Sequence, residues 1–148
     1  MSFLVDTNVL LRSVEPLHPH HAVSVAAVSR LIGQGSSVYF TLQNIAEFWN
    51  VATRPRDKNG LGFTVEEVLD EVERIESFLT LLPDVPAVYS IWKTLLVDHG
   101  VSGVQVHDAR LVATMRAHGV MGLLSFNVDD FRRYPGIELQ HPQSVVDR

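Results

Sequence analysis

Apolar positions along the chain follow two spacings: short uninterrupted runs, and longer segments with an apolar residue every three or four positions. Short runs are typical of buried strands, and the longer spacing is typical of amphipathic helices. The runs predict strands at residues 3–5, 38–40, 78–82 and 122–125, with an edge strand near 137–139. The longer segments predict a helix after residue 6, helices at 18–32, 42–53, 64–78, 86–99 and 108–118, and a helical turn at 128–133.

Local signals mark where several of these helices begin and end. Thr64 and Glu67 match the capping box that starts a helix, and Gly119 is a typical residue after a helix end. Pro55 stops the helix that precedes it, because a residue before proline avoids the helical conformation. Regular alternation of strands and helices predicts a mainly parallel sheet of four to five strands with helices on both faces, an α/β/α sandwich.

Composition narrows the classes of protein to which the chain can belong. The chain has 148 residues, a net charge of -5 and no cysteine, which excludes disulfides and thiolate chemistry. Apolar residues continue through the whole length, so we expect one domain over residues 1–148. A basic leader and a membrane-length apolar run are both missing, and we therefore expect a cytoplasmic protein without membrane contact.

Acidic and amide side chains follow the predicted strands or lie early in the predicted helices. Asp6 follows the first strand, Glu47 lies in the helix after the second, and Asp108 opens a later helix. A further group, Asn127, Asp129 and Asp130, follows the fourth strand. The carboxyl ends of parallel strands share one edge of a sheet, where open α/β proteins bind their ligands.

Several carboxylates at one edge would repel one another unless a cation compensates them. Oxygen ligands select hard divalent cations, so the sequence predicts a site for Mg²⁺ or Mn²⁺. Each acid also has an ordinary interpretation: Asp6 as a strand-end cap, Asp108 as a helix N-cap and Glu47 as a helix residue. The histidines at positions 18, 20 and 21 suggest a transition-metal site, but a loop and helix start around Pro19 accounts for them better.

Four segments of the chain resemble the PIN-domain ribonuclease family and, within it, the bacterial VapC-type toxins of toxin–antitoxin systems. They are FLVDTN at residues 3–8, NIAEF at 44–48, HDARLVA at 107–113 and LSFNVDDF at 124–131. The resemblance implies a PIN-like fold, in which Asp6 and Asp108 hold the metal most directly and Glu47 assists. Asn127 matches the last catalytic position, while Asp130 is a further metal ligand and Asp129 a third alternative for that fourth group.

Small polar residues beside these acids complete the predicted site. We expect Thr7, Asn8 and Ser125 to position carboxylates or water by hydrogen bonding. The resemblance implies metal-dependent hydrolysis of RNA phosphodiester bonds, and it also implies a protein antitoxin and a homodimer as partners. Helices 18–32 and 64–78 are the candidates for those protein contacts.

Two groups of basic residues flank the predicted site, although the chain as a whole is acidic. We expect phosphate contacts from Arg54, Arg56, Lys58, Arg110, Arg132 and Arg133, with solvated loop charges as the alternative. For Arg110, pairing with a neighbouring acid is a further alternative.

Two rival functions remain open from the sequence. One is a non-catalytic module of the same fold that binds RNA or protein. The other is an aspartate-dependent phosphatase, which would require a second acidic residue at the position of Asn8.

Overall fold

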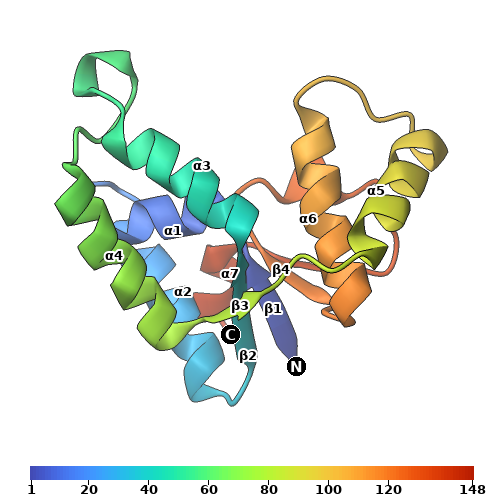
Figure 1. Ribbon diagram of the computed structural model, residues 1–148. Coiled ribbons are helices and arrows are strands. Elements are labelled where there is room, and N and C mark those ends of the chain that lie inside the picture. The colour runs from blue at the N-terminus through green and yellow to red at the C-terminus, as the bar shows by residue number, and fades with distance from the viewer.

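A computed structural model describes residues 1–148 and places five short strands in one sheet between two layers of helices (Figure 1). The strands are β1 Ser2–Val5, β2 Ser37–Thr41, β3 Thr80–Leu82, β4 Gly122–Leu124 and β5 Glu138–Gln140. Their order across the sheet is β3-β2-β1-β4-β5, and all four pairings are parallel. The predicted α/β/α architecture is confirmed, and β1 lies at the centre of the sheet.

Seven helices cover the two faces. They are α1 Thr7–Ser13, α2 His21–Gly33, α3 Leu42–Thr53, α4 Val65–Phe78, α5 Ala87–Asp98, α6 Gln105–His118 and α7 Pro142–Val146. Two short 3-10 turns, Arg56–Lys58 and Val128–Phe131, lie in the connections. Figure 1 shows α5 and α6 on one side of the sheet and α1 to α4 on the other. No helix has both the length and the apolar character needed to cross a membrane.

Side chains of β1 alternate between two hydrophobic cores. Phe3 and Val5 pack into the core under α1 to α4 and α7, whereas Leu4 packs into the core under α5 and α6. Both faces of the strand are buried, which explains why it appears in the sequence as a continuous apolar run. Each such buried side chain contributes about 1.5–3 kcal/mol to folding. The cores therefore hold the end of β1 in a fixed place at the sheet edge.

The predicted helix signals are confirmed. Thr64 Oγ1 accepts a hydrogen bond from the Glu67 backbone, and Glu67 Oε1 accepts one from the Thr64 backbone, at 3.1 and 3.0 Å. Gly119 ends α6 with a φ of 69°, a conformation that glycine adopts without strain.

Several boundaries differ from the prediction. α2 begins at His21 rather than at residue 18, because the preceding residues form turns through Pro16 and Pro19. α6 begins one turn before Asp108, so Val104 occupies the N-cap position and the N-cap interpretation of Asp108 is wrong. α4 continues through Phe78, so β3 begins only at Thr80. The short helix α7 was not predicted.

Candidate functional site

Asp6 lies where β1 ends and α1 begins, at the carboxyl edge of the sheet. Its Oδ1 accepts a hydrogen bond from the Thr7 backbone at 2.8 Å, so the carboxylate caps α1. Its Oδ2 accepts one from the Ser125 hydroxyl at 2.7 Å. Only 8% of Asp6 is exposed, and this burial raises its pKa from 3.8 to about 6 against the opposing effect of the two hydrogen bonds. The neighbouring charges of Glu47 and Asp130 are smaller contributions to this same rise.

Ser125 and Asn8 tie the end of β4 to the start of α1. The Ser125 hydroxyl accepts hydrogen bonds from Asn8 Nδ2 at 3.3 Å and from the Asn127 backbone at 2.9 Å. Asn8 Oδ1 accepts one from the Phe126 backbone at 3.3 Å. Both side chains thus contact the Asp6 carboxylate, Ser125 at 2.7 Å and Asn8 at 3.4 Å.

Glu47 projects from α3 toward the same edge. Thr7 Oγ1 donates a hydrogen bond to Glu47 Oε1 at 3.1 Å, and Asn44 Nδ2 donates one to Thr7 Oγ1 at 3.0 Å. Asn44 is fully buried, and its Oδ1 accepts a hydrogen bond from the Thr41 backbone at 2.8 Å. A chain of hydrogen bonds therefore joins β2, α3 and α1 behind Glu47. Sequence reasoning gave Asn44 no role, although Thr41 and Asn44 have capping-box spacing.

Asp108 is half-buried in the first turn of α6, which lies on the opposite side of the sheet from the α3 helix that carries Glu47. Burial is the main cause that raises its pKa from 3.8 to about 7, and the charges of Asp6, Asp130 and Glu47 raise it further. Arg133 acts in the opposite direction. Asp108 and these three acids, which the chain draws from four separate segments, therefore lie within electrostatic reach of one another.

The chemistry of these four groups fits a hard divalent cation, since every donor is a carboxylate oxygen. In the structure no three acidic or imidazole side chains converge closely enough to ligate one ion by themselves. Mg²⁺ does not require such a cluster, because it is usually bound by one or two carboxylates and keeps several waters. The arrangement does not resemble a structural zinc site, which encloses its ion in four protein ligands.

The three alternatives for the fourth group are all exposed but differ in their surroundings. The charge of Asp130 contributes to the raised pKa of both Asp6 and Asp108, so Asp130 lies within electrostatic reach of them. Asp129 is exposed and forms an ion pair with Arg132. The Asn127 side chain is exposed and forms no hydrogen bond within the chain, although its backbone contacts Ser125.

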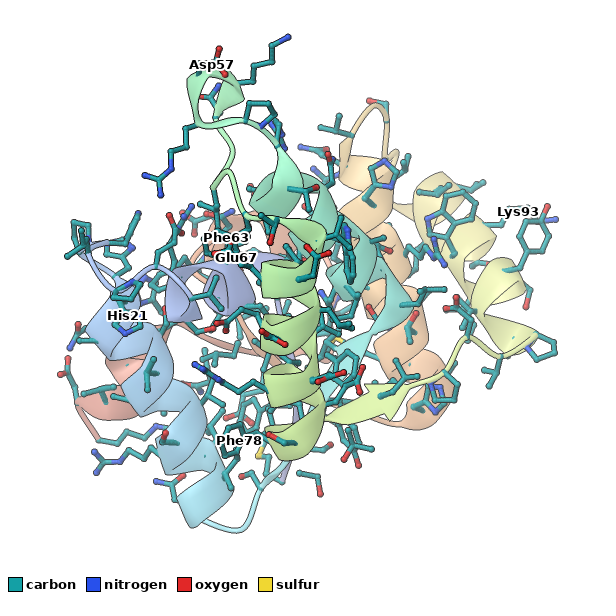
Figure 2. All side chains as sticks on the ribbon, turned by 60° about the vertical axis from the view of Figure 1, so that its left-hand side comes forward. His21, Asp57, Phe63, Glu67, Phe78 and Lys93 are labelled. Atoms are coloured by element: carbon teal, nitrogen blue, oxygen red, sulfur yellow. The ribbon has the colours of Figure 1, made fainter.

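The predicted phosphate-binding residues fall into two sets. Arg110 pairs with Asp84 at 2.9 Å, Arg132 pairs with Asp129, and Arg133 donates to Gln105 Oε1 at 2.8 Å. In contrast, Arg54, Arg56 and Lys58 form no ion pair. They belong to the connection between α3 and α4, whose tip at Asp57 projects from the body of the molecule in Figure 2.

The three histidines near the start of α2 do not converge as a group of metal ligands would. The His21 ring contacts the Arg12 carbonyl oxygen at 3.0 Å, which ties the helix start to α1. His20 stacks on Phe126 with ring centroids 4.8 Å apart, and the His141 ring meets the edge of Phe126 at 5.2 Å. The loop and helix-start interpretation agrees with these contacts.

Comparison with known proteins agrees with this geometry. The chain matches the PIN domain family over residues 3–137. It is 25% identical over 146 residues to ribonuclease VapC48 of Mycobacterium tuberculosis, covering 97% of this chain and 99% of the relative.

Solved structures share the fold at lower identity. VapBC2 of Rickettsia felis, bound to a DNA fragment from its promoter, aligns with a TM-score of 0.68 at 16% identity, over 95% of this chain and 98% of the other. VapC20 of Mycobacterium tuberculosis, a toxin that cleaves the sarcin-ricin loop, aligns with a TM-score of 0.63 at 16% identity, over 87% and 92% of the two chains.

Proposed function

Because the chain belongs to the PIN-domain family, we propose that it is a ribonuclease that hydrolyses RNA phosphodiester bonds with the help of Mg²⁺ or Mn²⁺. The observation that carries this proposal is the group of four carboxylates at the sheet edge. Burial is the main cause that raises the pKa of Asp6 and Asp108, and the charges of their acidic neighbours add to the rise. A site that accumulates negative charge in this way favours a divalent cation.

In this proposal Asp6 and Asp108 hold the cation most directly, and Glu47 and Asp130 complete its surroundings. A divalent ion supplies Lewis acidity and neutralises charge on the attacked phosphate. Ser125, Asn8 and Thr7 keep the Asp6 and Glu47 carboxylates in place, since each donates a hydrogen bond to one of them. Asn127 lies at the rim, where its exposed amide can orient water or substrate.

RNA contacts come from the basic connection between α3 and α4. Arg54, Arg56 and Lys58 carry charges that no acid of the chain neutralises through an ion pair. Phosphate contacts of this kind position a nucleic acid without reading its sequence. Arg133 is a second proposed contact, and the lowering effect of its charge on the pKa of Asp108 supports this role.

The direct test is cleavage of structured RNA by the purified chain with Mn²⁺, beside Asp108→Asn and the control Asp98→Asn. Asp98 is exposed at the end of α5 and lies in no ion pair. We expect cleavage by the wild-type chain and the Asp98 variant only. Equal cleavage by all three proteins would contradict the proposed site, and RNA binding without cleavage would favour the non-catalytic module.

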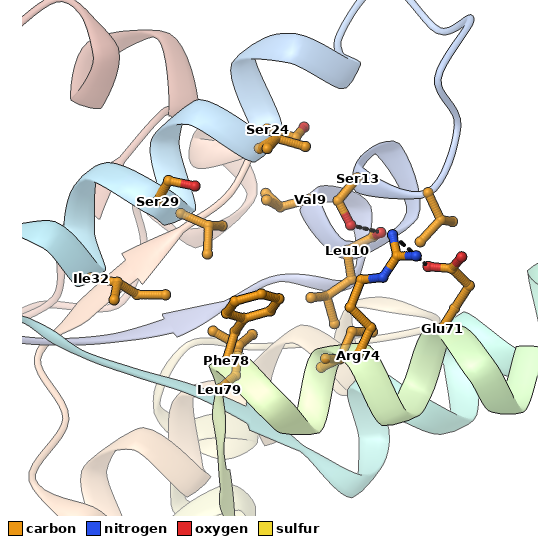
Figure 3. Close-up of a pocket in the computed structure, with 14 residues that line it drawn as sticks. Val9, Leu10, Ser13, Ser24, Ser29, Ile32, Glu71, Arg74, Phe78 and Leu79 are labelled. Carbon is orange, nitrogen blue, oxygen red and sulfur yellow. Dashed lines mark hydrogen bonds and ion pairs between the residues drawn. The ribbon is translucent and has the colours of Figure 1, made fainter.

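We also propose that the chain is the toxin of a toxin–antitoxin pair, as the names of its relatives suggest. An apolar pocket of about 220 Å³ lies between α1, α2 and α4, and Figure 3 shows Val9, Ile32 and Phe78 around it. Phe78 is 66% exposed there. Helices 18–32 and 64–78, which the sequence suggested for protein contacts, supply most of this pocket. An apolar helix of the antitoxin fits such a surface.

Replacement of Phe78 tests this partner site. Phe78→Lys should weaken binding of the cognate antitoxin by at least about thirtyfold, because a hot-spot aromatic contributes about 2 kcal/mol or more. Val97→Lys, at an exposed position of α5, is the control. Calorimetry with both variants measures the effect, and equal affinities would place the antitoxin elsewhere.

A second copy of the chain has a separate candidate surface. Leu42, Leu81 and Tyr89 are between 47% and 64% exposed. They line two adjoining pockets that share Asp84. We propose that this face forms the homodimer.

A further inference from the structure

Gln43 is a buried polar residue that has no role in the proposed reaction described above. It lies in the first turn of α3 and is 8% exposed. Its Nε2 donates a hydrogen bond to the carbonyl oxygen of His107 at 2.8 Å. The same nitrogen makes a longer contact of 3.5 Å with Glu47 Oε1.

These two contacts connect opposite sides of the acidic group. Gln43 and Glu47 are four positions apart on α3, so their side chains meet on one face of the helix. His107 directly precedes Asp108 in the first turn of α6. One amide nitrogen therefore touches the Glu47 carboxylate and the peptide that carries Asp108.

No other hydrogen bond joins α3 to α6. Figure 1 shows these helices on different sides of the sheet, with the carboxyl edge between them. The distance between Glu47 and Asp108 thus depends on two separately packed layers and on this one bridge.

Burial of Gln43 also carries a cost that packing does not explain. Its Oε1 is buried and accepts no hydrogen bond from the chain. A buried amide oxygen without a donor destabilises a fold, whereas an apolar side chain of the same length would avoid this penalty. The amide therefore suits a role at the site better than a role in the core.

We propose that Gln43 is a positioning residue that fixes the separation of Glu47 and Asp108 and so determines how tightly the site binds its divalent cation. This inference rests on the proposed function. Hydrogen-bonding partners behind metal ligands typically affect metal affinity by about tenfold to a hundredfold.

The test compares Mn²⁺ affinity, measured by electron paramagnetic resonance of free Mn²⁺, in four variants of the full chain. Gln43→Met keeps the length of the side chain and removes the amide. Gln34→Met makes the same change at an exposed position after α2. Leu31→Ala removes a buried core side chain that forms no part of the bridge, and Asp108→Asn removes a proposed ligand.

We expect Gln43→Met to raise the Mn²⁺ dissociation constant by about tenfold or more and to lower kcat with little change in KM for RNA. Gln34→Met and Leu31→Ala should bind Mn²⁺ like the wild-type chain at temperatures where all are folded. Wild-type affinity in Gln43→Met, with binding lost in Asp108→Asn, would overturn the role of Gln43 and leave the proposed function intact. A wild-type chain that binds no Mn²⁺ would overturn both.

Discussion

Asp6 and Asp108 are held where burial and neighbouring charges both oppose their ionised forms. Their pKa values rise from 3.8 to about 6 and about 7 in the folded chain. A carboxyl whose folded pKa lies above its unfolded value contributes stability below about pH 4, and this contribution is lost as pH rises through the folded value. The ion-free protein should therefore lose stability between about pH 4 and pH 7.

Asp108→Asn should make the ion-free protein more stable at pH 8 and leave it nearly unchanged at pH 4. The pKa shift would correspond to about 4 kcal/mol without screening. Because the carboxyl is only half-buried, solvent reduces the expected gain to about 1–2 kcal/mol. Urea unfolding at both pH values measures it, and equal effects at the two pH values would contradict the assignment.

The fourth acidic group can be identified by paired variants. Asp130→Asn should lower the pKa of Asp108, because the Asp130 charge raises it, and should reduce Mn²⁺-dependent cleavage by about tenfold or more. Asp129→Asn should change cleavage by less than about twofold, since that exposed side chain pairs with Arg132. Carbon NMR titration of Asp108 and initial rates provide the measurements. The reverse ranking would make Asp129 the fourth group.

Residues with a simple relation to the strands could be predicted from the sequence. Asp6 follows β1 directly, and the structure places it with Glu47 and Asp108 in one electrostatic environment. Gln43 could not be predicted, because its significance depends on a carbonyl group 64 positions away. For the same reason, the sequence did not determine whether Arg110 pairs with Asp84.

At the level of elements, helix ends were predictable where a side chain or glycine defines them. The capping box of α4 and the end of α6 at Gly119 are such cases. The start of α6 has no side-chain cap, so the sequence carried little signal for its first turn. The start of α2 lies after turns rather than at a cap, and α7 is only five residues long.

The basic connection between α3 and α4 has a defined backbone that depends on Gly60. A Cβ atom at this position would lie 1.9 Å from the Arg54 carbonyl oxygen. We expect Gly60→Ala to destabilise the chain by about 1–3 kcal/mol and to weaken RNA binding by displacing Arg54 and Arg56. Gly33→Ala, where a Cβ atom meets nothing within 4 Å, is the matched control.

Thermal unfolding and RNA binding at fixed salt concentration measure the two effects. If both variants bind RNA like the wild-type chain, the basic connection does not contact the substrate.

At the level of the whole molecule, alternation of strands and helices was sufficient to predict the layers. Strand order was not predicted, because it depends on which strands pair. The chain runs from β1 through β2 to β3 at one edge and then crosses to β4 on the other side of β1. This crossover brings the ends of β1 and β4 together, so that Ser125 contacts Asp6. The site is thus a product of topology as well as of motif.

If the chain forms the proposed homodimer, a substitution at the exposed edge strand should change the mass of the sedimenting particle. Leu81 lies in β3 and is 47% exposed. Leu81→Lys should convert the dimer into a monomer, because a lysine at the centre of an apolar interface would be buried without a partner. Sedimentation velocity measures the mass. A wild-type chain that sediments as a monomer would exclude this interface.

We propose that the carboxylates at the sheet edge bind a divalent cation that RNA cleavage requires. Removing divalent ions with EDTA and restoring Mn²⁺ in steps tests this, while both bound Mn²⁺ and the RNA cleavage rate are recorded. We predict that cleavage disappears with the ion and returns in proportion to its occupancy. Cleavage that persists in EDTA, or that does not follow the bound ion, would contradict the claim.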